Sequence, residues 1–221
     1  MSQCSWARPQ LRVTVLSNIR ATCTPWICAI LPWRLALRPL RQKFDELEDL
    51  LLHHRRTLAQ NTGVPFLRLV YQPEEEISCQ RLQGILARTL ARKGIRIETV
   101  SCRGVIFTHY EQRQQLDWLF ELEQAEGDQL SASIAKHARR ELTERLLRAT
   151  ERLQGDGVIF LTDVAFLYPY LNLSTVLDDC TNHIVPPMAL VIFYPGEIDA
   201  DNRLLFLGQR ESGYYRTRDL I

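Results

Sequence analysis

Hydrophobic residues recur at two spacings along this chain, and the two spacings alternate from about residue 44 onward. An apolar side chain every three or four residues is typical of a helix packed on one face, and a short apolar or β-branched run is typical of a strand. The helical spacing predicts helices over residues 44–58, 73–93, 109–123, 129–154 and 174–183. The short runs predict strands over residues 64–71, 95–100, 158–161, 189–193 and 204–207.

Strands that alternate with helices predict an α/β fold with a mostly parallel sheet flanked by helices. The runs at residues 158–161 and 189–193 are continuously apolar, as in strands buried on both faces of a parallel sheet. Gly127 and Asp128 predict a break between two successive helices. Either Asn172 or Ser174 is expected to cap the helix that follows.

Residues 1–43 differ in composition from the rest of the chain. They hold seven of its 27 basic residues, none of its 26 acidic residues and three of its four tryptophans, and prolines interrupt any long period. Such a segment can be a targeting or membrane-surface arm, a disordered arm, or an extension upstream of the true start. Composition favours the start-site extension, so we expect residues 44–221 to form a single domain.

The remainder of the chain is mildly acidic, with 20 basic residues against 26 acidic ones. Proteins that bind nucleic acid non-specifically cluster basic residues on one face, so we expect no direct binding of nucleic acid. No run approaches the roughly 20 apolar residues that a membrane helix needs. The cysteines are scattered without paired spacing, which suits buried thiols in the cytoplasm.

A nucleotide site would need a glycine-rich loop after the first strand, where main-chain N–H groups bind phosphate. The sequence has Gln72, Pro73 and three glutamates there instead. Proline removes a donor and carboxylates repel phosphate. We therefore expect P-loop-like or Rossmann-like layering without a phosphate-binding loop, and no cofactor.

Acidic residues nevertheless allow a metal hypothesis. Asp163 follows an apolar strand, as does the acidic residue that holds magnesium in P-loop enzymes, and Glu197, Asp199 and Asp201 alternate after a second strand. Together they could serve a metal-dependent nuclease or nucleotide hydrolase. The alternative is a solvated acidic turn, and no catalytic motif is complete, so we expect no enzyme activity.

Large aromatic residues distinguish the last third of the chain. Rings beside prolines or arginine are common anchors of protein interfaces, although tyrosines next to apolar strands are also packed in cores. The motifs predict partner-binding candidates at Tyr168, Pro169, Tyr170, Tyr194, Pro195, Gly196, Glu197, Asp199, Tyr214, Tyr215 and Arg216.

The same part of the chain resembles the BrxB family of bacteriophage-exclusion (BREX) defence systems. The resemblance runs from about Phe44 to the end and is strongest after Gly157. It rests on the ordered motifs Val158-Ile159-Phe160-Leu161-Thr162, Leu167-Tyr168-Pro169-Tyr170, Ser174-Thr175-Val176-Leu177, Phe193-Tyr194-Pro195-Gly196-Glu197, Leu205-Phe206-Leu207-Gly208 and Tyr214-Tyr215-Arg216.

The resemblance implies a small, cytoplasmic, non-catalytic adaptor that contacts a PglZ-like phosphatase-fold protein and other subunits of a defence complex. It supplies no catalytic residues. Relatives often have glycine where this chain has Asp163, which argues against a catalytic role for that residue. We predict that Tyr215→Ala or Arg216→Ala weakens partner capture without unfolding the domain.

Overall fold

The computed structural model describes residues 38–199, 203–208, 210–211 and 216–221. Most of the predicted extension, residues 1–37, lies outside the described residues. So do three of the residues singled out from the sequence, Asp201, Tyr214 and Tyr215.

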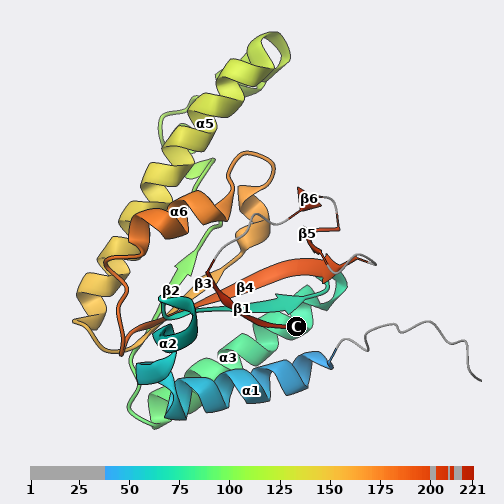
Figure 1. The fold of residues 1–221 in the computed structure, drawn as a ribbon. Coiled ribbons are helices and arrows are strands. Elements are labelled where there is room, and N and C mark those ends of the chain that lie inside the picture. Colours follow the sequence, from blue (N-terminus) through green and yellow to red (C-terminus); the bar gives the residue numbers. More distant parts are fainter. Residues whose placement is uncertain (1–37, 200–202, 209, 212–215) are drawn as a thin grey trace, which may run out of the picture. The chain divides into compact units, whose positions relative to one another are not determined.

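A parallel sheet forms the centre of the fold (Figure 1), in the strand order β2-β3-β4-β1-β7. Its strands are β1 (Phe66–Tyr71), β2 (Ile97–Ser101), β3 (Val158–Thr162), β4 (Ala189–Ile198) and β7 (Arg218–Leu220). The outer end of β4 pairs antiparallel with β5 (Leu204–Phe206), which pairs in turn with β6 (Arg210–Glu211). The predicted mostly parallel α/β fold is confirmed.

Helices cover both faces of the sheet, with α1 and α3 on one face and α5 and α6 on the other (Figure 1). These four helices are α1 (Leu40–His53), α3 (Glu76–Arg92), α5 (Leu116–Leu153) and α6 (Leu173–Cys180). Shorter turns of helix complete the described elements: η1 (Arg55–Thr57), α2 (Ala59–Thr62), η2 (Pro73–Glu75), α4 (Thr108–Gln112) and η3 (Val164–Leu167).

The apolar strand runs are explained by these two helical layers. Successive side chains of a strand point to opposite faces, so a strand covered on both sides needs apolar residues at every position. In β3, Val158 and Phe160 pack with α1 and α3, whereas Ile159 and Leu161 pack with α5 and α6. Each of these four side chains is at most 2% exposed.

The first helix begins at Leu40 rather than at residue 44. Leu40 and Lys43 are both buried, and Lys43 Nζ donates a hydrogen bond to the main-chain oxygen of Val70 at 2.8 Å. Counting apolar positions missed this turn because a lysine faces the sheet there and its charged end is satisfied by a backbone carbonyl.

The predicted break at Gly127 and Asp128 is wrong, because α5 is one continuous helix of 38 residues. Glycine inside a helix costs only about 1 kcal/mol relative to alanine, so it does not by itself end one. The predicted stripe along the second part of the helix is buried as expected, from Ile134 to Leu153. At the next helix, Asn172 is the cap, and its side-chain oxygen accepts a hydrogen bond from the Ser174 main-chain N–H at 3.1 Å.

The C-terminal strands differ most from the prediction. Strand β4 continues through Pro195 and Gly196 to Ile198, past the predicted end at residue 193. The short strand β7 was not predicted, because its sequence Arg-Asp-Leu has one apolar residue and no alternation. Leu220 is fully buried against the α1 and α3 face, and β7 pairs with β1.

Within the described part of the chain, no helix combines the length and the apolar character that crossing a bilayer requires.

Candidate functional site

The carboxyl ends of the parallel strands meet at one edge of the sheet, where α/β proteins commonly bind ligands and partners. Three strands leave this edge in different ways. Strand β1 leads into η2 and α3 on one face, and β3 leads into η3 and α6 on the other face. Strand β4, between them, continues outward and pairs with β5. The outer part of β4 therefore lies between two connections that leave the sheet on opposite faces.

Four aromatic side chains lie along this edge, and we call them the aromatic row: Phe166, Tyr168, Tyr194 and Phe206. The ring centroids of Tyr168 and Phe206 are 6.1 Å apart, and those of Tyr194 and Phe206 are 5.0 Å apart. Phe166 is 46% exposed and Tyr168 is 41% exposed, whereas Tyr194 is buried. The row thus has a buried base and an exposed outer part.

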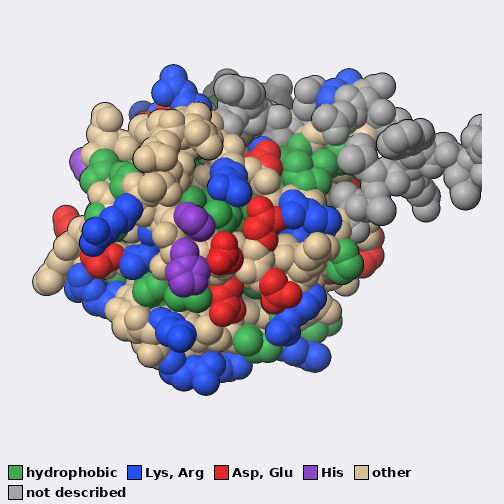
Figure 2. All heavy atoms as spheres, turned by 60° about the horizontal axis from the view of Figure 1, so that its bottom comes forward, with side chains coloured by type: hydrophobic (Ala, Val, Ile, Leu, Met, Phe, Trp, Pro, Cys, Tyr) green, Lys and Arg blue, Asp and Glu red, His purple; other side chains and the backbone are tan. Residues whose placement is uncertain are grey.

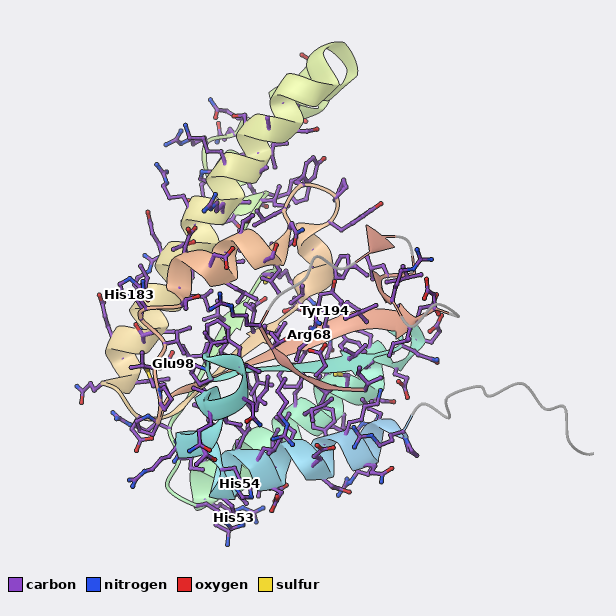
Figure 3. The ribbon with its side chains drawn as sticks, viewed as in Figure 1. His53, His54, Arg68, Glu98, His183 and Tyr194 are labelled. Atoms are coloured by element: carbon purple, nitrogen blue, oxygen red, sulfur yellow. The ribbon has the colours of Figure 1, made fainter. Side chains whose placement is uncertain are left out.

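Arginine side chains flank the aromatic row at both ends. The guanidinium carbon of Arg103 lies 5.1 Å from the centroid of Phe166, and that of Arg68 lies 5.2 Å from the centroid of Tyr194. These distances are within the range of cation–π attraction. Figure 3 shows Arg68 and Tyr194 side by side over the sheet. Arg68 is held in place by Asp219 of β7, through hydrogen bonds of 2.9 and 2.6 Å.

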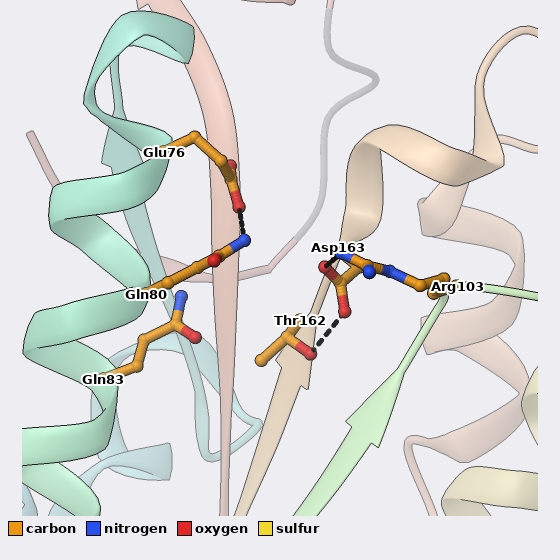
Figure 4. A pocket seen from close by; sticks show the side chains of 6 residues that line it. All are labelled: Glu76, Gln80, Gln83, Arg103, Thr162 and Asp163. Carbon is orange, nitrogen blue, oxygen red and sulfur yellow. Dashed lines mark hydrogen bonds and ion pairs between the residues drawn. The ribbon is translucent and has the colours of Figure 1, made fainter.

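A polar pocket of about 190 Å³ lies next to the row, between α3 and the ends of β2 and β3 (Figure 4). Glu76, Gln80 and Gln83 line it from α3. Opposite them lie Thr162 and Asp163 at the end of β3, with Arg103 from the loop after β2. Arg103 therefore belongs to both features.

The carboxylate of Asp163 is engaged by neighbouring protein groups. Ser101 Oγ donates a hydrogen bond to it at 2.6 Å, Thr162 Oγ1 lies 3.2 Å away, and Arg103 Nη2 forms an ion pair at 3.2 Å. Asp163 itself adopts a left-handed backbone conformation, with φ of 58°, which aspartate tolerates better than most residues. These contacts explain Asp163 as the residue that turns the chain and ties the end of β3 to β2.

The α3 side of the pocket is also internally bonded. Tyr71 Oη donates to Glu76, and Gln80 Nε2 donates to the other Glu76 oxygen at 2.7 Å. Burial and this hydrogen bond raise the pKa of Tyr71 far above its ordinary value, so the phenol stays protonated as a donor.

Burial also raises the pKa of Cys79 and Cys180 to about 12, so both thiols are protonated near neutral pH and are poor nucleophiles.

The acidic residues of the metal hypothesis do not gather in the part of the chain that is described. Asp199, near the outer end of β4, binds Arg203 through a hydrogen bond from Nε at 2.9 Å, whereas Asp163 binds the groups at the end of β2. Among the described residues, no group of three or more histidine, cysteine, aspartate or glutamate side chains could hold a metal ion. Asp201 lies outside the described residues.

The other predicted candidates have mixed positions. Pro195 and Gly196 are buried within β4, and Glu197 is exposed. A Cβ atom at Gly196 would lie 2.6 Å from the main-chain oxygen of Leu205, so glycine lets β5 approach. Tyr170 packs against the core on the α5 and α6 face. Arg216 is exposed.

Four residues of the edge were not among the sequence candidates. Phe166 and Phe206 are separated by 40 positions along the chain, so sequence proximity does not link them. Arg68 carried the clearest signal, because a lone arginine inside an apolar strand requires a partner. Arg103 had none, since its two partners lie on other elements.

Charge does not mark a nucleic-acid site on the face seen in Figure 2, which views the molecule from the side of α1. Acidic side chains are interspersed there with lysines, arginines and histidines. Several are paired: Arg38 and Arg218 each bind Glu46, and Arg41 lies 3.4 Å from Asp45. A continuous basic surface is absent from this face.

Comparison with known proteins identifies the family. The family described as "BREX protein BrxB" matches residues 99–220, which is more than half of the 221 residues. The chain is also similar to a curated protein of Bacillus cereus (strain H3081.97) named "BREX protein BrxB", with 23% identity over 193 residues, 84% of this chain and 99% of that relative. No solved structure matches the chain. The matched region contains Asp163, Arg103 and the whole aromatic row, and the chain belongs to the BrxB family of components of the BREX phage-exclusion system.

Proposed function

We propose that this protein is a non-catalytic adaptor of the BREX defence complex, and that it binds its partner through the aromatic row. The observation that carries the proposal is the exposure of Phe166 and Tyr168 in a row whose base, Tyr194, is buried. Exposed apolar rings that lie next to one another are typical of interaction sites, and rings anchored on a rigid base lose little entropy on binding.

The arginines at the two ends strengthen this interpretation. Aromatic residues and arginine are the side chains most enriched among the anchors of protein interfaces. Arg103 is 64% exposed over Phe166, where its guanidinium can still donate to a partner's carboxylate. The row therefore combines an apolar anchor with a directional charged donor.

The partner we propose is the PglZ-like phosphatase-fold protein, in the cytoplasm. The proposal rests on what the family resemblance implies and on the adaptor-like surface described above. The unpaired thiols of Cys79, Cys102 and Cys180 are consistent with a reducing compartment. Other subunits of the complex are the alternative partners.

Co-purification tests the proposal. The full chain carries an affinity tag and is expressed with a PglZ-like protein of a BREX system, as wild type and as the double variant Phe166→Ala/Tyr168→Ala. We expect capture by the double variant to fall at least about tenfold, as for anchor residues in other interfaces. Undiminished capture by that variant contradicts the proposed surface.

Ile77 supplies a matched control. It is an apolar side chain on α3 that is 75% exposed and lies outside the aromatic row. Ile77→Ala removes a similar exposed apolar group, so capture should stay at the wild-type level. Equal losses in Ile77→Ala and in the double variant would mean that general surface hydrophobicity, and not the row, drives association.

The non-catalytic part of the proposal has its own test. Its support is the set of hydrogen bonds that Ser101, Thr162 and Arg103 form with the Asp163 carboxylate. These bonds give the carboxylate a structural role in joining the ends of β2 and β3. Purified protein is incubated with magnesium or manganese and with nucleoside triphosphates, DNA or RNA. Hydrolysis that Asp163→Asn abolishes would establish the rival metal-dependent enzyme instead.

A further inference from the structure

Strand β2 is an edge strand, and its main chain is available along one side. Among the described strands it pairs with β3 and no other. Val158 N donates to Arg96 O, and Cys102 N donates to Thr162 O, both at 2.9 Å. Because main-chain groups alternate in direction along a strand, those of Ile97, Thr99 and Ser101 point away from β3.

A row of arginines from α5 stands beside this edge. Arg145, Arg148 and Arg152 follow one another at helical spacing, and with β2 they line a groove of about 320 Å³. The small side chain of Ala149 also lines the groove and is buried there. Arg145 Nη1 lies 3.4 Å from the Ser101 main-chain oxygen, which places the arginine row directly against the outward groups of β2.

The groove carries a positive excess. Arg145 binds Glu141 at 2.8 Å, and Arg148 lies 3.8 Å from the same Glu141 oxygen. Arg152 binds Glu98 of β2 at 3.3 Å, beside the C-terminal part of α5 (Figure 3). Three guanidinium groups thus share two carboxylates, and those of Arg148 and Arg152 are more than half exposed.

We infer that this groove binds an extended acidic peptide segment of a partner protein, which adds to the sheet as a strand next to β2. Addition of a strand uses the outward N–H groups of residues 97, 99 and 101 and the outward C=O groups of residues 97 and 99, because the Ser101 oxygen already accepts from Arg145. Carboxylates on alternate residues of the peptide reach the arginine row. The inference concerns a surface separate from the aromatic row and is independent of it.

Two other occupants fit the groove less well. A nucleic acid could neutralise the arginines, but its phosphates have no donors for the outward C=O groups of β2. A second copy could pair β2 with β2, but an antiparallel pair related by a two-fold axis perpendicular to the sheet brings two arginine rows to the same face.

The binding test uses a soluble fluorescent peptide of alternating threonine and glutamate, twice as long as β2, measured by anisotropy with the full chain. Two further peptides keep the design but change one property each. One replaces glutamate by lysine, and the other carries N-methyl groups on alternate residues, which remove the donors of one strand edge. We expect the first peptide to bind and both altered peptides to bind at least about tenfold more weakly.

Variants of the protein separate the two contributions. Arg148→Ala/Arg152→Ala should weaken peptide binding at least about tenfold, because both exposed guanidinium groups are lost. Arg140→Ala is the matched control, since Arg140 is an equally exposed arginine of α5 that pairs with Glu144 and does not line the groove. It should leave the affinity within about twofold of wild type.

Thr99→Pro addresses the strand edge directly. The N–H group of Thr99 points away from β3, so proline removes a donor for the peptide without removing a hydrogen bond of the sheet. We expect a folded protein, by circular dichroism, with at least about tenfold weaker binding. If this variant fails to fold, the N-methylated peptide still tests the same hydrogen bonds.

Several results would overturn the inference. Equal binding of the N-methylated peptide would show an electrostatic contact without strand addition. Tighter binding of a single-stranded DNA oligonucleotide, lost in Arg148→Ala/Arg152→Ala, would make the groove a nucleic-acid site. Concentration-dependent dimers in sedimentation, abolished by Thr99→Pro, would assign the edge to a second copy. Loss of peptide binding in Phe166→Ala/Tyr168→Ala would move the peptide to the aromatic row.

Discussion

Two groups of aromatic rings in this protein differ in their exposure to solvent, although some of their members are close neighbours in the sequence. Phe44, Phe160 and Phe193 form a cluster on the face of the sheet that α1 and α3 cover, where each ring is at most 4% exposed. Phe44 stacks on Phe193 at 5.8 Å, and Phe160 meets Phe193 edge to face at 5.2 Å. The aromatic row at the carboxyl edge has the same kinds of ring, but Phe166 and Tyr168 are 46% and 41% exposed there.

Strand β4 contributes to both groups from adjacent positions. Phe193 points toward α1 and enters the buried cluster, whereas Tyr194 points to the opposite face and forms the base of the aromatic row. The type of residue therefore does not tell which aromatic side chains stabilise the fold and which ones are candidates for binding a partner. The burial of each ring and the face of the sheet on which it lies do tell them apart. Substitutions in the two groups should therefore differ in their effects on stability and on partner capture.

The largest effect is expected for Phe193→Ala. Removing a fully buried ring loses its burial energy and leaves a cavity, so the free energy of unfolding should fall by about 3–5 kcal/mol. Urea denaturation followed by circular dichroism measures this change. A loss below about 1 kcal/mol would mean that the cluster collapses to fill the space, and that the contrast with the row is weaker than burial indicates.

Arg68→Met should give the next largest effect, and it should lower both stability and partner capture, which the other substitutions affect separately. Arg68 is a member of the edge by its contact with Tyr194, yet its side chain is 11% exposed and is bound to Asp219. Removing it leaves a partly buried carboxylate without its partner, so stability should fall by about 2 kcal/mol, together with partner capture.

The double variant Arg68→Met/Asp219→Asn completes this test. If the ion pair between β1 and β7 causes the loss, the second substitution should recover part of it, because the unpaired charge is removed. Additive losses in urea denaturation would show instead that the two side chains act independently.

Phe166→Ala should show the opposite pattern to Phe193→Ala, with little change in stability and a loss of partner capture. Its ring is exposed, so the free energy of unfolding should change by less than about 0.5 kcal/mol. Partner capture should nevertheless decline, because the ring is an outer anchor of the row. The same urea titration used for Phe193→Ala provides the measurement. A loss of several kcal/mol would mean that the row is a structural element and that its exposure has another cause.

Asp179→Asn should have the smallest effect and supplies a baseline away from both aromatic groups. Arg139 Nε and Nη2 donate to the Asp179 carboxylate at 2.7 Å, which joins α5 to α6 on the surface. The hydrogen bond from Arg139 lowers the pKa of Asp179 below its ordinary value of 3.8. The pair therefore stabilises the fold fully above that value, and the contribution is lost as pH falls through the lowered pKa.

The substitution should lower the urea midpoint slightly at neutral pH, and less so in high salt. The difference from wild type should shrink as pH falls through the lowered pKa of Asp179. Asp178→Asn is the control, because it removes the neighbouring exposed carboxylate and keeps both hydrogen bonds from Arg139. A difference that persists unchanged at acid pH would exclude the ion pair as its source.

The sheet itself could be predicted from the sequence because its signal is local. A strand buried on both faces needs four or five apolar residues in succession, and the runs at 158–161 and 189–193 have them. Strand β7 lacked that signal, since its three residues gain their place from pairing with β1 and from the burial of Leu220. Helix α5 was divided in two because glycine is a breaker only on average.

The candidate site could be predicted only in part, for a similar reason. Tyr168 and Tyr194 were found because tyrosine beside proline is a visible local pattern, and they do converge on Phe206. Their flanking arginines were not found, since each reaches its ring from another element. Ser101, a hydrogen-bond partner of Asp163, lies 62 positions earlier in the chain. The sequence alone therefore left a metal hypothesis open for Asp163, beside the polar turn that the structure has there.

Strand β4 has one more consequence, which is mechanical. The same ten residues run from the middle of the parallel sheet to the hairpin with β5, with no loop between. A pull on that hairpin along the strand axis would load the bonds to β1 and β3 in shear, so many must yield at once. An assembly that pulls on this edge would thus act directly on the central strand of the parallel sheet.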